Sequence, residues 1–219
     1  MTPSTATATR RGSEPRSTVA RRRATARRRR RGLMALLGAA LVVALVVVTL
    51  PLARQAVSEF GLPLQYQGVI RRQAAEKRLD PALIAAVIYA ETKFDARTSS
   101  AGAEGLMQIL PQTAEFLAHR SGATTFTTAD LGTPRVNIAY GSYYLRYLLD
   151  HYRGVTWRAL AAYNGGEANV DGWLAAARAR GERFTIAEIP FSETRAYVQR
   201  VLEARQDYRH QYAGQLGYS

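Results

Sequence analysis

An uncharged stretch of 22 residues, 32–53, limits how this chain can fold more than any other feature. It is rich in Leu, Val and Ala, and it stands between Arg31 and Arg54. At about 1.5 Å per residue, a helix of this length spans roughly 33 Å, which is enough to cross the hydrocarbon core of a bilayer. The sequence therefore predicts one transmembrane helix over residues 32–53.

The charges beside this stretch predict its orientation. The Arg-rich side should stay in the cytoplasm, which places the C-terminal part outside the cell membrane, in a periplasm or a wall zone. A cleaved signal peptide has the same order of charge and apolar residues and remains an alternative. An uncleaved anchor is favoured, because the run is longer than a signal-peptide core and residues 50–54 lack the small side chains of a cleavage site. We therefore expect a single-pass membrane protein that contacts the lipid bilayer through residues 32–53.

The net charge of +13 is concentrated at the N-terminus. Residues 1–32 contain eleven of the 30 basic residues and one acid, so the other 187 residues carry a net charge of only +3. Such a balance is not that of a nucleic-acid-binding domain, and no nucleic-acid partner is expected, although binding of DNA or lipid by the basic arm is an alternative. Residues 1–31 are expected to form a disordered cytoplasmic arm. The absence of cysteine excludes a disulfide scaffold, a thiolate zinc site and a cysteine nucleophile.

The residues beyond the apolar run follow a helical pattern almost throughout. We expect a linker over 54–63, a folded domain over 64–212 and a tail over 213–219, because Gly61 and Pro63 interrupt any helix that leaves the membrane. Asp80 followed by Pro81 is typical of a helix start, and Thr156 and Ser192 are predicted caps of two further helices. No alternating strand pattern stands out. The predicted domain is all-α, with helices over 81–92, 111–119, 134–152, 156–164, 167–179 and 193–211.

Glu91 is the first candidate for chemistry. Residues 81–90 contain no charge, so their helix should be buried nearly all round. The spacing of Ile84, Val87 and Ile88 places Glu91 on the same face as these aliphatic side chains. Burial and the negative end of the helix dipole both disfavour the ionised carboxylate, so the pKa of Glu91 should be raised. A carboxylic acid that stays protonated near neutral pH suits a general acid.

Four segments resemble, in order and spacing, the signatures of a known family. They are the helix that ends at Glu91 with the segment Gly105-Leu106-Met107-Gln108 after it, then Ala162-Tyr163-Asn164-Gly165, and finally Glu193-Thr194-Arg195-Ala196-Tyr197. Together they resemble the soluble-type (SLT) lytic transglycosylases, which are lysozyme-like enzymes that cleave peptidoglycan. The resemblance covers residues 64–210 and implies a mainly helical, lysozyme-like catalytic domain. Its substrate would be the glycan strands of peptidoglycan.

The resemblance also implies a role for individual residues. Glu91 matches the single catalytic acid and base, and the family's usual Ser after this Glu is here Thr92, which keeps the hydroxyl. The residues that match substrate-binding or cleft positions are Ser100, Gln108, Tyr163, Asn164, Glu193 and Tyr197. No cofactor and no metal are implied, and the histidines at 119, 151 and 210 have no metal-ligand spacing.

The number of carboxylates leaves two enzymatic reactions open. A single acid suits a substrate-assisted route, in which the resemblance implies closure of a 1,6-anhydro ring without water. A muramidase of the goose-type lysozyme class would hydrolyse the same bond and would need a second acid, for which Asp95 and Glu193 are candidates. A membrane-tethered glycan-binding module without catalysis is a third alternative, disfavoured because a buried acid costs stability.

Overall fold

A computed structural model describes residues 61–218 of the chain, which fold as one unit that begins at Leu62. The predicted arm 1–31, the predicted transmembrane helix 32–53 and most of the predicted linker lie outside the described residues. Within residues 61–218, no helix combines the length and the apolar character that a membrane span requires.

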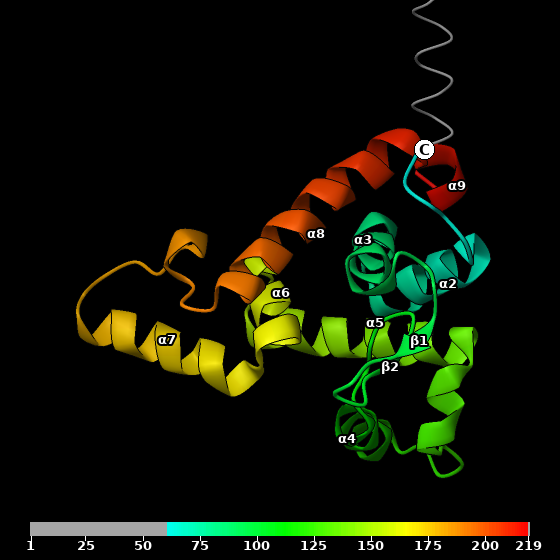
Figure 1. The fold of residues 1–219 in the computed structure, drawn as a ribbon, viewed down its shortest axis with the longest axis horizontal. Coiled ribbons are helices and arrows are strands. Elements are labelled where there is room, and N and C mark those ends of the chain that lie inside the picture. The colour runs from blue at the N-terminus through cyan, green and yellow to red at the C-terminus, as the bar shows by residue number, and fades with distance from the viewer. Residues whose placement is uncertain (1–60, 219) are drawn as a thin grey trace, which may run out of the picture. The chain divides into compact units, whose positions relative to one another are not determined.

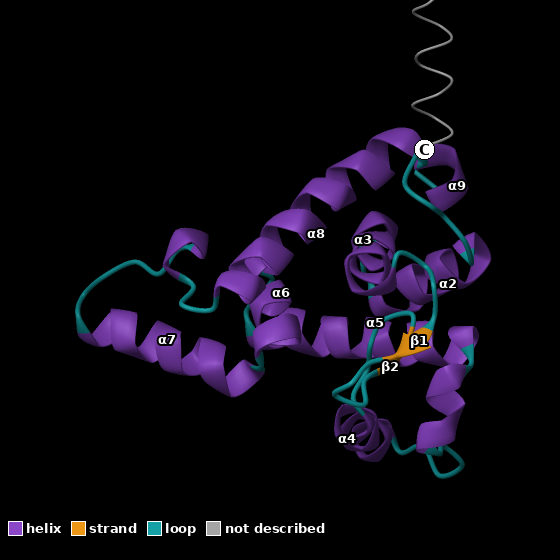
Figure 2. Ribbon diagram, viewed as in Figure 1, coloured by secondary structure: helices purple, strands orange, loops and turns teal. Residues whose placement is uncertain are grey.

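The described residues are mainly helical, as expected, with one short two-stranded hairpin (Figures 1 and 2). In the hairpin, Arg97 pairs with Gly105 and Thr98 with Glu104 in antiparallel register. The elements in chain order are α2 (Gln67–Lys77), α3 (Pro81–Thr92), β1 (Arg97–Thr98), β2 (Glu104–Gly105), α4 (Pro111–Ser121), η1 (Thr128–Gly132), α5 (Pro134–His151), α6 (Thr156–Gly165), α7 (Glu167–Ala179), η2 (Ile186–Glu188), α8 (Ser192–Gln211) and α9 (Ala213–Leu216).

Helix α3 lies at the centre of the core, as its uncharged sequence predicts. Every residue from Ala82 to Ile88 is buried, and α3 packs mainly against the long helix α8. Its N-terminus is capped by Asp80, whose carboxylate accepts a hydrogen bond from the Ala82 amide at 3.0 Å. The helix ends at Thr92 because Lys93 adopts a left-handed conformation with φ of 53°. Glu91 is thereby fixed in the last turn of a fully packed helix.

Two predicted helix caps are wrong by one residue. Thr156 and Ser192 are the first residues of α6 and α8, and the capping positions are held by Val155 and Phe191, neither of which makes a side-chain capping bond. Residue type alone does not determine the first residue of a helix, which is why both predicted starts differ from the structure by one position.

The segment predicted as a tail packs on the domain as far as Tyr218. Its Leu216 is buried in α9, and the Tyr218 hydroxyl donates a hydrogen bond to the capping carboxylate of Asp80. The start of the domain is held in a similar way, since Tyr212 donates to the carbonyl of Leu62 at 2.6 Å and Tyr208 to that of Pro63 at 2.6 Å. The folded unit is therefore slightly longer at both ends than the predicted 64–212.

Candidate active site

The Glu91 carboxyl is largely removed from water, which favours its protonated form. Burial raises the pKa of Glu91 from 4.5 to about 7, and the nearby negative charge of Glu193 acts in the same direction. The Tyr197 hydroxyl and the positive charges of Arg200 and Arg97 oppose this rise without cancelling it. The prediction of a raised pKa is confirmed, with desolvation as the main cause.

Two tyrosines flank Glu91. Tyr197, from α8, is 2% exposed, and its hydroxyl makes no hydrogen bond of normal geometry to any of the residues the structure describes. Tyr163, from α6, is partly buried and donates from its hydroxyl to the carbonyl of Met107 at 2.8 Å. Burial and the nearby Glu91 raise the pKa of both phenols well above 10, so both hydroxyls are neutral donors at physiological pH.

The segment from Gly105 to Gln108 is tied to α3 by Thr92. The buried Thr92 hydroxyl donates to the carbonyl of Leu106 at 2.8 Å, with the carbonyl of Ile88 at 3.2 Å as a second acceptor. This bond joins the residue after Glu91 to the segment that carries Gln108. Thr92 therefore makes its hydrogen bonds through the hydroxyl that it shares with the family's usual Ser.

A second tie comes from Asn137 in α5, which the sequence analysis did not select. Its side-chain oxygen accepts from the Met107 amide at 2.7 Å, and its side-chain nitrogen donates to the carbonyls of Glu104 at 2.8 Å and Leu131 at 3.0 Å. Asn137 is fully buried. The sequence signal that could have identified Asn137 is an asparagine between apolar residues of a predicted helix. A buried amide needs hydrogen-bond partners, which here are backbone groups of the loop. Asn137 fixes the backbone of the loop on which the cleft is built.

Gln108 lies at a small cavity of about 240 Å³ that Tyr163 and Asn164 also line. The Gln108 backbone has a positive φ of 49°, and its side-chain nitrogen donates to the carbonyls of Arg97 at 2.7 Å and Gly105 at 2.8 Å. These bonds hold the amide across the start of the hairpin and leave its position fixed. Three predicted site residues are thus brought together at this cavity.

The cavity continues along α4 into a second hollow of about 280 Å³. The two hollows share Gln112, Thr113 and Tyr144, so they form one groove. The far hollow adds Phe116, Tyr147 and Glu167, and Phe116 is 43% exposed. Exposed aromatic faces beside amide and hydroxyl groups are suited to sugar rings. We call these two hollows together the groove.

The other predicted site residues lie farther from the groove. Glu193, in the first turn of α8, is exposed but near enough for its charge to affect Glu91. Ser100 is exposed in the turn between β1 and β2 and does not line the groove. Asp95, a candidate second acid, is exposed beyond the end of α3.

Arg97 is a further residue at the site that the sequence analysis missed. Its guanidinium donates to the backbone carbonyl of Glu91 at 2.9 Å. Its charge therefore lies beside the last turn of α3, where it favours ionisation of the carboxyl. A cation at the C-terminal end of a helix complements the helix dipole. An arginine shortly after the predicted end of this helix was the signal that could have identified Arg97.

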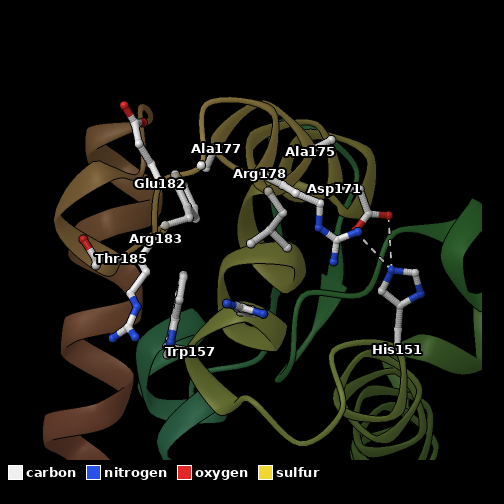
Figure 3. A pocket seen from close by; sticks show the side chains of 13 residues that line it. His151, Trp157, Asp171, Ala175, Ala177, Arg178, Glu182, Arg183 and Thr185 are labelled. Carbon is white, nitrogen blue, oxygen red and sulfur yellow. Dashed lines mark hydrogen bonds and ion pairs between the residues drawn. The ribbon is translucent and has the colours of Figure 1, made fainter.

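One cluster among the described residues has the chemistry of a metal site. His151, Glu167 and Asp171 offer ligand atoms that all lie within 4.8 Å of one another. In the structure these groups bind one another, since the His151 ring lies 3.1 Å from Asp171 (Figure 3). The same ring lies 3.7 Å from Glu167, and Tyr152 donates to Asp171 at 3.1 Å. No metal is expected from the sequence, because residue spacing does not reveal that α5 and α7 bring these side chains together.

Comparison with known proteins decides the family. The family model described as "Transglycosylase SLT domain" matches residues 68–186, which is more than half of the chain and includes α3, the hairpin, the groove and α6. The chain belongs to the SLT transglycosylase family. The soluble lytic murein transglycosylase of Escherichia coli is 32% identical over 155 residues, covering 69% of this chain and 24% of that protein. The membrane-bound lytic murein transglycosylase C of Actinobacillus pleuropneumoniae is 30% identical over 168 residues, covering 67% of this chain and 46% of that protein.

Solved structures agree with this SLT membership. An inactive mutant of the lytic transglycosylase Slt from Pseudomonas aeruginosa superimposes with a TM-score of 0.64 at 32% identity, covering 69% of this chain and 25% of that one. A soluble lytic transglycosylase in complex with bulgecin A gives the same TM-score of 0.64 at 31% identity. The mainly helical, lysozyme-like fold predicted from the sequence is confirmed. The chain spans about a quarter of the length of the first of these relatives.

Proposed function

We propose that this SLT-family protein is a peptidoglycan lytic transglycosylase with Glu91 as its only acid and base. The observation that carries the proposal is a buried carboxyl with a pKa of about 7, held beside two neutral tyrosine hydroxyls close to the groove. At neutral pH such a group is present in both its protonated and its ionised form, so it can first donate and then accept a proton.

The proposed reaction balances without water. Glu91 donates its proton to the oxygen between N-acetylmuramic acid and N-acetylglucosamine, and the bond from that oxygen to the muramoyl C1 breaks. The acetamido oxygen of the substrate stabilises the positive charge at C1. The Glu91 carboxylate then takes the proton of the muramoyl 6-hydroxyl, whose oxygen bonds to C1 and closes the 1,6-anhydro ring. No second carboxylate is needed, and the exposed position of Asp95 is consistent with that.

The substrate roles of the other site residues are part of the proposal. Gln108, Tyr163 and Asn164 would contact the glycan in the groove, and Tyr197 would donate from its hydroxyl near Glu91. Glu193 would bind the strand at the open edge of the site. Ser100 would contact the glycan beyond the hairpin, and its exposure leaves its side chain accessible to a long polymer.

We also propose that residues 32–53 anchor the protein in the cell membrane with the catalytic domain outside. The uncharged run beside a strongly basic segment supports this placement. One relative is named as a membrane-bound lytic murein transglycosylase, which is consistent with work at the membrane surface.

The test compares the full chain in detergent with its Glu91→Gln variant on purified peptidoglycan. Mass spectrometry of the released fragments should show products one water lighter than hydrolysis products, and Glu91→Gln should reduce their rate by at least about a thousandfold. Glu203→Gln, an exposed site on α8, is the matched control and should cleave normally. Products with ordinary reducing ends would instead establish a muramidase. Binding without cleavage by the parent chain would favour a glycan-binding module.

A further inference from the structure

A separate pocket of about 930 Å³ lies between α6, α7 and the segment 180–185 that follows α7 (Figure 3). It shares no lining residue with the groove. In Figure 3, Arg178 lies on the side of His151 and Asp171, whereas Arg183 lies on the opposite side with Trp157. We call it the arginine pocket, after the three arginines that line it, Arg158, Arg178 and Arg183.

The charges of the arginine pocket are unbalanced. None of its three guanidiniums forms an ion pair with a carboxylate of residues 61–218. Its two acids are already engaged, because Asp171 binds His151 at 3.1 Å and Glu182 binds Arg180 at 2.7 Å. Three uncompensated guanidiniums that line one cavity favour an anionic ligand.

The lining also includes apolar and aromatic side chains. The side chains of Trp157, Leu174 and Phe184 contribute, and the rings of Trp157 and Phe184 pack with centroids 5.9 Å apart. The Arg158 guanidinium carbon lies 5.3 Å from the centroid of the Trp157 ring. The Arg158 Nε is buried and has no hydrogen-bond partner among the described residues, which leaves a donor available to a ligand. A ligand that carries carboxylates on a less polar backbone fits a pocket that combines arginines with aromatic and apolar side chains.

The arginine pocket meets the groove across the first turns of α7. Glu167 lines the far end of the groove, and Asp171, one helical turn later, lines the arginine pocket. His151 contacts both carboxylates and so joins the two rims. One helical turn is only about 5.4 Å, so a branched ligand seated in the groove can reach the pocket with its side branch.

We propose that the arginine pocket binds the carboxylates of a peptide, and, resting on the proposed function, that this is the stem peptide carried by the glycan in the groove. Stem peptides are covalently attached to N-acetylmuramic acid and carry free carboxylates, so the occupant is an anionic branch of the same polymer. The pocket makes this protein selective for peptide-bearing strands over naked glycan.

Binding is tested with the full-length Glu91→Gln chain, which retains its ligand. Isothermal titration calorimetry compares a disaccharide–tetrapeptide fragment with the same disaccharide after an amidase has removed its peptide. The peptide-bearing fragment should bind about tenfold more tightly, the gain of one or two charge-assisted hydrogen bonds at a partly exposed site. Adding Arg178→Gln and Arg183→Gln should abolish this difference. Arg72→Gln with Arg135→Gln removes the same charge from exposed positions outside the pocket and should preserve it.

Equal affinity of the Glu91→Gln chain for the two fragments would overturn the inference, as would a preference that survives loss of both pocket arginines. Displacement of the peptide-bearing fragment by inorganic phosphate, at an ionic strength where chloride does not displace it, would also overturn it by assigning the pocket to phosphate.

Cleavage of peptide-free glycan strands by the parent chain is measured separately. Failure of that cleavage together with failure to cleave intact peptidoglycan refutes the proposed function and leaves the binding result to stand or fall by itself.

Discussion

At the scale of single residues, Glu91 links stability to pH. Its pKa is about 7 in the folded chain against 4.5 for an unperturbed side chain. Between these pH values the folded state holds a proton that the unfolded chain has released, so the stability from this group is lost as pH rises through about 7. Glu91→Gln cannot ionise. Its free energy of unfolding relative to the parent should therefore rise by about 2 kcal/mol between pH 5 and pH 8, after discounting for partial exposure.

Urea unfolding of the two chains at both pH values checks this expectation, with Glu203→Gln on the exposed face of α8 as the control. A Glu91→Gln effect that does not change with pH would show that the carboxyl is ionised in the folded protein. That result would remove the main support for Glu91 as an acid.

The same pKa predicts the pH dependence of the reaction. The proposed first step needs protonated Glu91, so kcat/KM on peptidoglycan should fall above pH 7, approaching about tenfold for each further pH unit. Arg97→Gln removes a positive charge that favours the ionised carboxyl, so it should move this decline to higher pH. Initial rates between pH 5 and pH 9 measure both, and a decline that Arg97→Gln moves to lower pH would contradict the assignment.

Thr92 is the residue where this chain departs from the family's usual Ser, and its hydroxyl is its essential part. Thr92→Val keeps the shape but leaves the buried Leu106 carbonyl without its donor, so it should lower the free energy of unfolding by about 1–3 kcal/mol. Thr92→Ser keeps the donor and should cost less than about 1 kcal/mol. Chemical denaturation of both variants distinguishes these outcomes. Equal losses in the two would indicate that packing of the methyl group, and not the hydrogen bond, is what Thr92 contributes.

At the scale of elements, α5 supports the loop from Glu104 to Gln108 through Asn137. Asn137→Ala removes three hydrogen bonds to the backbone of Glu104, Met107 and Leu131 and leaves a small cavity. We therefore expect a loss of about 2–4 kcal/mol in the free energy of unfolding. Cleavage should fall as well, because Gln108 then loses its fixed position. Asn169→Ala, at an exposed site with one local bond, is the control and should change stability by less than about 1 kcal/mol. Full activity of a folded Asn137→Ala chain would show that the loop needs no support from α5.

The helices were predictable where one strong local signal dominated. Asp80 before Pro81 and the uncharged run after it determine α3 to the residue, and the glycines at 165 and 166 mark the junction of α6 and α7. Other features depend on contacts between distant segments. The two-residue strands of the hairpin are too short for a strand pattern, and Asn137 acquires its role only when α5 lies against the loop at Met107. The packing of α9 depends on Asp80, which precedes it by more than 130 residues.

The predicted site residues also differ in how well the sequence indicates their positions. Tyr163 and Tyr197 come from α6 and α8, which pack against one another, and the structure places both near the Glu91 carboxyl. The hairpin turn that carries Ser100 is exposed, and no spacing in the sequence specifies where such a turn points. The arginine pocket had no sequence signal at all, because its three arginines come from α6, α7 and the segment after α7.

At the scale of the whole molecule, the folded unit and the predicted anchor are separate in the sequence. The domain from Leu62 onward is closed by its own tyrosine contacts to Leu62 and Pro63, so its stability should not depend on residues 1–60. The basic arm contains a net charge of +10 within residues 1–32. Such an arm attracts anionic lipid but is released by salt, whereas an inserted apolar helix is not.

Salt therefore distinguishes attachment by the basic arm from attachment by an inserted apolar helix. The full chain should sediment with membranes, stay there in 1 M salt and be released by detergent, because roughly 20 apolar residues stabilise insertion independently of ionic strength. Deletion of residues 32–53 should move the protein to the soluble fraction in high salt and leave its urea unfolding unchanged. A mature protein whose N-terminus begins near residue 54 would instead identify the apolar run as a cleaved signal, and the enzyme would then act at a distance from the membrane.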